Sequence, residues 1–185
     1  WDEFGILPDL PIIPTKIFPT SKQIIMEIGT GMGEATAEIA RNFPDTGFFA
    51  LEVHRPGIGA LIIRAENLGV RNLKIINEDI YEVLTKHIAD HTIDAFHIFF
   101  PDPWPKRRQH KRRLLQPSFI EILSSKLKHG GRINIATDWL PYAQEIEKNF
   151  AANSDFTGGV IRRPEWRPLT KFESKGITKE HVVTD

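Results

Sequence analysis

The chain has 185 residues, of which 41% are hydrophobic and 26% charged, and it contains no cysteine. This length supports one full hydrophobic core and is short for two, so we expect a single domain over residues 1–185. The lack of cysteine excludes a disulfide framework, thiolate metal ligands and a thiol nucleophile, and it fits a cytoplasmic protein. The start of the chain is not that of a signal peptide, and no apolar run approaches the roughly 20 residues of a membrane-spanning helix.

The formal net charge is zero, but the positive charge is unevenly distributed. Six basic residues lie between Lys106 and Arg113, and the rest of the chain carries 18 basic against 24 acidic residues. Such a cluster predicts a phosphate-binding strip on a mildly acidic body. A solvated charged surface is the ordinary alternative.

Apolar runs typical of buried strands alternate with amphipathic stretches along the chain. The predicted strands are 23–28, 47–53, 73–77, 93–100 and 132–137, and the predicted helices are 34–43, 58–68, 81–91, 118–128 and 141–152. This alternation indicates an α/β fold with a mostly parallel sheet covered by helices on both faces. Segments 156–163 and 180–185 are candidate antiparallel edge strands, which would make seven strands. Residues 1–22 are interpreted as an N-terminal extension, truncated because the chain begins without Met.

Ligands of such sheets bind at the carboxyl ends of the strands, and a glycine-rich turn follows the first predicted strand. It runs from Glu27 to Gly33 with the spacing G-x-G-x-G, at Gly29, Gly31 and Gly33. A dinucleotide-binding turn would have G-x-G-x-x-G, and here Glu34 would lie close to a pyrophosphate. S-adenosylmethionine has no phosphate, and the acidic Glu27 suits its cationic amino group, so the turn favours this methyl donor.

Two further acidic residues end the next strands of the predicted sheet. Glu52 can accept hydrogen bonds from both ribose hydroxyls, and Asp79 is placed to accept one from an adenine amino group. The alternatives are a solvated Glu52 and an Asp79 that caps a helix.

A stiff loop follows the fourth predicted strand, with the sequence PDPWPK from Pro101 to Lys106. Three prolines fix their own backbone angles and hold Asp102 at the mouth of the sheet, where a reacting group must be positioned closely. The alternative is a proline-rich turn with a solvated Asp102 and a Trp104 that only packs.

The string FPDPWPKRRQHKRR resembles the tRNA (guanine-N7-)-methyltransferase family, of the bacterial type. Further matches, in the glycine turn, Glu52-Val53-His54, Ala136-Thr137-Asp138 and the TKFE segment 170–173, extend the resemblance from about residue 24 to 176. It implies a Rossmann-like class I methyltransferase that forms 7-methylguanosine at guanosine 46 in the tRNA variable loop. The departures are Gln109, which interrupts the basic run, and an N-terminal arm that is largely missing.

The resemblance also implies roles for individual residues. It places S-adenosylmethionine, with no metal, against Glu27, Gly29, Gly31, Gly33, Glu52, Asp79 and Asp102. Asp102 takes the catalytic position, and the substrate contacts are Lys106, Asp138, Thr170, Lys171, Phe172 and Glu173. The residues facing RNA are Arg108, Gln109, His110, Lys111, Arg112 and Arg113.

N7 of guanine has a free in-plane lone pair and no proton, so we expect Asp102 to act by charge and orientation, without accepting a proton. Asp138 suits the guanine N1–H and N2–H, or else it caps the next helix. Phe172 can stack on a base or belong to the core. Arg162, Arg163 and Arg167 would extend the positive surface.

Three other functions compete with this interpretation. A small-molecule methyltransferase would leave the basic run unexplained, and a nicotinamide-dependent oxidoreductase is disfavoured by the glycine spacing. A non-catalytic RNA-binding subunit would not need all the donor-site acids. A monomer and a homodimer both remain open.

Overall fold

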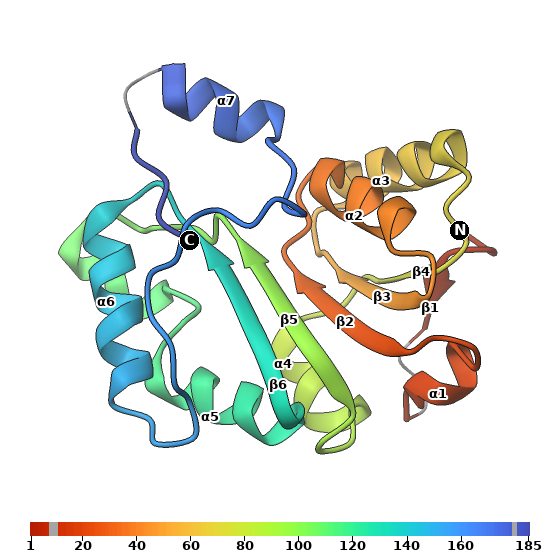
Figure 1. Ribbon diagram of the computed structural model, residues 1–185, viewed down its shortest axis with the longest axis horizontal. Helices are drawn as coiled ribbons and strands as arrows, with labels where there is room; N and C mark the ends of the chain where they lie inside the picture. The colour runs from red at the N-terminus through yellow and green to blue at the C-terminus, as the bar shows by residue number, and fades with distance from the viewer. Residues whose placement is uncertain (8–10, 179–180) are drawn as a thin grey trace.

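The computed structural model describes residues 1–7, 11–178 and 181–185, and its centre is a parallel sheet in the order β1-β4-β3-β2-β5-β6 (Figure 1). The strands are β1 (Gly5–Ile6), β2 (Gln23–Ile28), β3 (Thr46–Leu51), β4 (Leu73–Ile76), β5 (Ile93–Phe99) and β6 (Leu127–Ala136). The helices are α1 (Pro14–Ile17), α2 (Glu34–Asn42), α3 (Arg55–Leu68), α4 (Ile80–Glu82), the π-helix η1 (Val83–His87), the 3₁₀-helix η2 (Arg107–Arg112), α5 (Pro117–Lys126), α6 (Leu140–Ala151) and α7 (Lys171–Thr178). The α/β class and the five internal strands are confirmed.

Alternate residues of β3 show how the sheet separates two cores. Phe48 and Ala50 pack in one cluster with apolar residues of α2 and α3. Phe49 and Leu51 pack in the other cluster with apolar residues of α5 and α6. All four are fully buried or nearly so, which explains why β3 is an unbroken apolar run without polar alternation.

The prediction of one regular helix over 81–91 was wrong. The segment forms the short α4 and then η1, and the Ile88 N–H donates to the carbonyl of Val83, five residues back. Because the helix ends at His87, the carbonyl of this residue is free to accept from the N–H of Ile12 at 2.8 Å, so η1 links to the N-terminal segment. None of the described helices is long and apolar enough to span a membrane.

The prediction of seven strands was also wrong. Segment 156–163 forms no strand, and within 181–185 only Thr184 bridges to Thr137, antiparallel, while residue 180 lies outside the described residues. Consecutive glycines at 158 and 159, the first with φ of 152°, interrupt the extended run. The sixth strand is instead β1, which pairs with β4 and was not predicted.

The strand order reverses beside β2. From β2 the chain proceeds to β3 and β4 on one side, and it later returns through β5 and β6 on the other side. The turns after β2 and β5 therefore leave neighbouring strands at the same edge of the sheet, which is where open α/β sheets bind ligands. In Figure 1, α7 lies above this edge, over the ends of β5 and β6.

Candidate functional site

Three glycines shape the turn after β2. Gly29, Gly31 and Gly33 have φ angles of 75°, 55° and 71°, a region that side chains disfavour. A Cβ on Gly29 or Gly31 would meet nothing within 4 Å, so the space outside the turn is open. A Cβ on Gly33 would lie 2.6 Å from the Cβ of Leu61, so this glycine lets α2 and α3 approach closely.

Glu27 lies below this turn and is buried, with 3% of its surface exposed. Burial raises the pKa of Glu27 to about 7, the nearby Thr36 hydroxyl opposes the shift, and the charge of Glu52 adds to it. Within the described ranges, Oε2 of Glu27 and Oγ1 of Thr30 have no hydrogen-bond partner. Buried polar atoms without partners are rare, and their presence beside an open turn fits a polar, cationic ligand.

Glu52 and Asp79 have different surroundings. Glu52 is buried, and its two oxygens accept from the N–H groups of Gly31 at 2.7 Å and His54 at 2.8 Å, so it is not solvated. Asp79 is exposed and caps α4, accepting from the N–H of Tyr81 at 2.9 Å. Asp79 therefore caps the helix, as the alternative prediction stated, and it does so through Oδ1.

The loop after β5 has unusual backbone angles on both sides of Asp102. Phe100 and Trp104 have φ angles of 53° and 43°, and such residues persist only where their surroundings hold them. The N–H of Phe100 donates to the carbonyl of Ala136 at 2.7 Å. Asp102 is exposed and lies on the loop that follows β5, the strand that pairs with β2.

The C-terminal segment returns to this edge. The backbone N–H of Lys171 donates to Glu34 at 2.8 Å, directly after the glycine turn. The Phe172 ring packs edge-on against Phe100 with centroids 5.2 Å apart, while 60% of Phe172 stays exposed. Thr170 accepts from the N–H of Glu173 at 3.2 Å. These contacts bring the start of α7 against both turns.

Asp138 follows β6 and faces the same segment. Its Oδ2 lies 2.8 Å from Nδ1 of His181. The N-cap of α6 is Trp139, which makes no side-chain cap hydrogen bond, so Asp138 does not cap this helix. Of the two roles predicted for Asp138, the structure therefore excludes that of helix cap.

The basic run forms η2, next to the proline loop. Lys106, Arg108, Lys111 and Arg112 are exposed, and Gln109 and His110 are half-buried. These side chains form a basic strip, defined here as residues 106–112. The Arg112 guanidinium lies 5.1 Å from the centroid of the Trp104 ring, so Trp104 belongs to this surface.

Three residues expected on binding surfaces are buried instead. Arg113 is 2% exposed and pairs with Glu145, so its guanidinium is not available to a phosphate. Arg167 and Glu173 are each 2% exposed and form a bidentate ion pair of 2.7 and 3.0 Å. The basic run and the family resemblance suggested these surface roles, and neither reveals a buried partner that lies far away in the chain.

Sequence reasoning missed His97, which is paired in register with Glu27 across β5 and β2. Burial lowers the pKa of His97 to about 3, so the ring is neutral. Its ring stacks on Trp166, with centroids 4.9 Å apart and 18° between the planes. Only the strand pairing reveals that a neutral imidazole adjoins Glu27.

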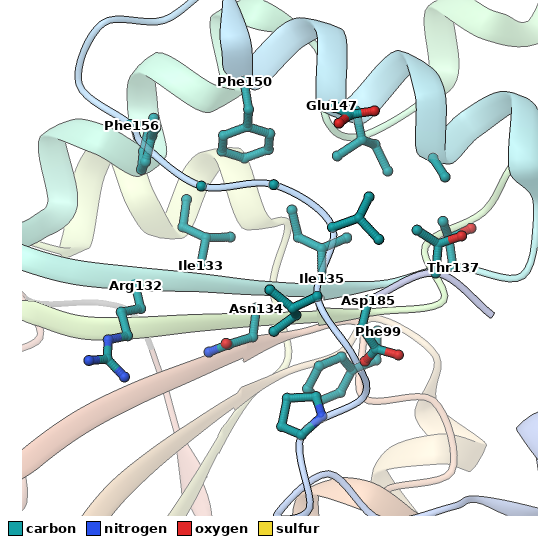
Figure 2. Close-up of a pocket in the computed structure, with 18 of the residues that line it drawn as sticks. Phe99, Arg132, Ile133, Asn134, Ile135, Thr137, Glu147, Phe150, Phe156 and Asp185 are labelled. Atoms are coloured by element: carbon teal, nitrogen blue, oxygen red, sulfur yellow. The ribbon is translucent and has the colours of Figure 1, made fainter.

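A cavity of about 500 Å³ lies between β6, α6 and segment 156–161 (Figure 2). Ile133 and Ile135 point into it from β6, facing Phe150 and Phe156. Trp166 and Arg167 line it, whereas none of the residues predicted to contact the donor or the guanine does. The cavity is lined by segment 156–161, which was expected to form an edge strand and does not. Elsewhere in the described chain, no three His, Cys, Asp or Glu side chains gather as metal ligands would.

Comparisons with known proteins identify the family of the chain. A family model described as "Putative methyltransferase" matches residues 21–185. The chain is 46% identical to a tRNA (guanine-N(7)-)-methyltransferase of Nitrosomonas europaea, over 98% of this chain and 83% of that protein. It is 41% identical to one of Streptomyces avermitilis, over 100% of this chain but only 66% of that protein.

The fold is also similar to that of solved methyltransferases. The 16S rRNA methyltransferase KamB superimposes with a TM-score of 0.65 at 15% identity, over 91% of this chain and 88% of that one. An identity this low supports the fold alone. The sequence relatives are much closer, and on their evidence the chain belongs to the tRNA (guanine-N(7)-)-methyltransferase family.

Proposed function

We propose that this chain transfers the methyl group of S-adenosylmethionine to N7 of guanosine 46 in the variable loop of tRNA. One observation carries the proposal: the glycine turn with Glu27 and the proline loop with Asp102 leave adjacent strands, beside the exposed basic strip. The names of the relatives supply the reaction and the tRNA substrate.

The residues around the glycine turn fit the methyl donor. Open space outside Gly29 and Gly31 lets a ligand approach the backbone, and the unpartnered oxygen of Glu27 suits a cationic amino group. Gly33 gives the turn its close packing. Glu52 would hold the ribose, and Asp79 the adenine amino group, through oxygen lone pairs that the backbone does not use. S-adenosylmethionine supplies an electrophilic methyl group on a positively charged sulfur.

Asp102 is the proposed catalytic residue. N7 of guanine is an acceptor without a proton, so the nucleophile needs no general base. As positive charge moves onto the guanine ring, a fixed carboxylate lowers the energy of that charge and helps to hold guanine in line. Pro101 and Pro103 restrict the backbone on both sides of Asp102, which keeps the carboxylate in place.

The segment over the pocket would bind the guanine. Asp138 would accept from N1–H and N2–H after exchanging its partner His181, because one carboxylate oxygen now faces that imidazole. The exposed ring of Phe172 offers a stacking surface next to Phe100. Thr170, Lys171 and Lys106 complete the proposed substrate contacts.

The basic strip would bind the phosphates of tRNA. Arg108, Lys111 and Arg112 are exposed cations, with Gln109 and His110 between them. Arg162 and Arg163 are also exposed and extend the positive surface, whereas the buried Arg167, Glu173 and Arg113 are left out of it. This strip disfavours a small-molecule methyltransferase, whose binding would not depend on salt. We further propose a cytoplasmic enzyme of one domain, monomeric or homodimeric.

The experiment is methylation of tRNA transcripts with isotopically labelled donor, followed by nucleoside mass spectrometry. We expect 7-methylguanosine in a transcript with guanosine at position 46 and none in a matched transcript with adenosine there. Unmodified RNA in both transcripts, or a methyl group on another atom of the base, would contradict the proposal.

A further inference from the structure

Arg113 is the last residue of the basic run in the sequence, but in the structure it is buried and does not belong to the exposed basic strip. Whereas Lys111 and Arg112 are exposed, Arg113 is 2% exposed. Its Nε donates to the backbone carbonyl of Pro103 at 2.8 Å, and its Nη1 pairs with Glu145 of α6. Burying a guanidinium is costly, so a site that does so must supply partners with good geometry.

The bond to Pro103 fixes a particular peptide plane. The Pro103 carbonyl belongs to the peptide unit that joins Pro103 to Trp104, so holding this oxygen restrains the φ angle of Trp104. That angle is 43°, in the left-handed region that residues other than glycine rarely adopt. The Arg112 guanidinium lies over the Trp104 ring at 5.1 Å, so two successive arginines hold the backbone and the ring of the same residue.

The other contacts of Arg113 lead to α6. Its guanidinium lies 4.9 Å from the centroid of the Tyr142 ring. The Tyr142 hydroxyl accepts from the N–H of Leu115 at 3.1 Å, which holds the chain just after Arg113 against the same helix. α6 begins two residues after Asp138. The contacts of Arg113 therefore connect the loop that carries Asp102 to the helix that follows Asp138.

We propose that Arg113 is a positioning residue, which holds the proline loop against α6 so that Asp102 keeps its place. It does not bind tRNA phosphate. Asp102 is one residue from the restrained carbonyl and precedes a proline, which limits it to extended conformations. Since Pro103 also fixes its own φ, few backbone torsions separate the restrained peptide from Asp102, and a shift of that peptide is expected to displace Asp102. The proposal rests on the function given above for Asp102.

Lysine cannot replace this arginine. A planar guanidinium reaches the Pro103 carbonyl and the Glu145 carboxylate through different nitrogens, whereas an ammonium is a single point of charge. Nη2 of Arg113 has no hydrogen-bond partner among the described residues. Arg113→Lys is consequently expected to behave like Arg113→Gln.

The test compares Arg113→Gln with Lys111→Gln, a matched change two residues away on the exposed side of η2. Arg113→Gln should lower kcat about 10- to 100-fold, because a misplaced group costs rate, and leave KM for tRNA and the donor Kd within about twofold. Lys111→Gln should raise KM for tRNA and reduce the salt slope of binding by about one, with kcat retained.

A second readout does not depend on activity. The four tryptophans can be replaced by 5-fluorotryptophan, and the ¹⁹F signal of Trp104 assigned with Trp104→Phe. Arg113→Gln should shift or broaden the Trp104 signal while Trp1 and Trp166 stay unchanged. If the wild type does not methylate tRNA, the proposed function fails, but this signal still tests the restraint on the loop.

Further variants keep the proposal open to refutation if Arg113→Gln does not fold. Glu145→Gln keeps the bond to Pro103, and the new amide oxygen on α6 can still accept from Nη1 of Arg113. It should therefore retain kcat and the Trp104 signal, whereas Arg113→Lys should lose both. The proposal is overturned if Arg113→Lys and Glu145→Gln lower kcat equally with the Trp104 signal unchanged. It is also overturned if Arg113→Gln raises KM for tRNA as Lys111→Gln does.

Discussion

Glu52 accepts a hydrogen bond from the backbone N–H of Gly31 at 2.7 Å, so a carboxylate at the end of β3 holds the turn that follows β2. Its other oxygen accepts from the N–H of His54 at 2.8 Å. The residue proposed to bind ribose therefore also shapes the glycine turn. A change at Glu52 should affect both the ligand and the turn.

Glu52→Gln should weaken binding of S-adenosylhomocysteine about 10- to 100-fold, because hydrogen bonds to a charged group contribute about 1.5–3 kcal/mol each. Isothermal titration calorimetry measures this affinity, and hydrogen exchange at residues 29–33 should rise in the free protein. Glu66→Gln, on the exposed side of α3, is the control and should change neither. An unaltered affinity in Glu52→Gln would remove Glu52 from the proposed site.

Gly33→Ala should be more damaging than Gly31→Ala. Both positions have positive φ, which costs a residue with a side chain about 1–2 kcal/mol. Only at Gly33 would the new Cβ also meet Leu61, at 2.6 Å. Urea unfolding should show a larger loss of stability for Gly33→Ala, and equal losses would mean that the contact with α3 is relieved at no cost.

Glu27 should make both stability and donor binding depend on pH. The pKa of Glu27 is raised to about 7 in the folded protein, so the folded state binds the proton more tightly than the unfolded state does. Its contribution is full below about pH 4.5 and is lost as pH rises towards 7, by up to about 3 kcal/mol relative to Glu27→Gln. Urea unfolding of both proteins from pH 5 to 8 measures the difference.

The donor should follow the opposite trend, since a cationic amino group prefers ionised Glu27. Affinity for S-adenosylhomocysteine should rise between pH 5.5 and 7 in the wild type, and Glu27→Gln should bind more weakly with a flatter profile. Parallel profiles for the two proteins would show that Glu27 does not contact the amino group.

Asp102→Asn should lower kcat about 100- to 1000-fold, the usual cost of losing one preorganised electrostatic group. Although the resemblance places the donor against Asp102, donor affinity should stay within about twofold, because the other proposed donor contacts, from the glycine turn, Glu52 and Asp79, are unchanged. A pH–rate profile of the wild type that requires one basic group, and loses this requirement in Asp102→Asn, would instead identify Asp102 as a proton acceptor.

Glu173→Gln should loosen α7 even without tRNA. Glu173 and Arg167 are both 2% exposed, and removing one partner of a buried ion pair is destabilising. Arg167 keeps Asp185 as a second partner, so the loss should be smaller than the cost of about 3–5 kcal/mol for an uncompensated buried charge. Hydrogen exchange across 171–178 should accelerate, whereas Glu165→Gln, at an exposed position of the same segment, should have no effect. If exchange changes only in the presence of tRNA, Glu173 acts through the substrate.

The sequence by itself determined the α/β class, the five internal strands and the positions of the glycine turn and the proline loop. Apolar periodicity and the positions of glycine and proline are local signals, and they predicted the bounds that β2 has in the structure, 23–28. Local signals also located Asp102 and the glycine turn. They did not find β1, whose two residues are too short for any period.

Only the tertiary structure decided which charged residues are buried and with what. Arg113 and Arg112 are neighbours in one basic run, yet the first pairs with Glu145, 32 residues later, and the second lies over Trp104 at the surface. Glu27 and His97 are 70 residues apart and become adjacent through the pairing of β2 with β5. The physical reason is that the burial and the pKa of a side chain depend on strand order and helix packing. Both of these arise from contacts between residues that are distant in the chain.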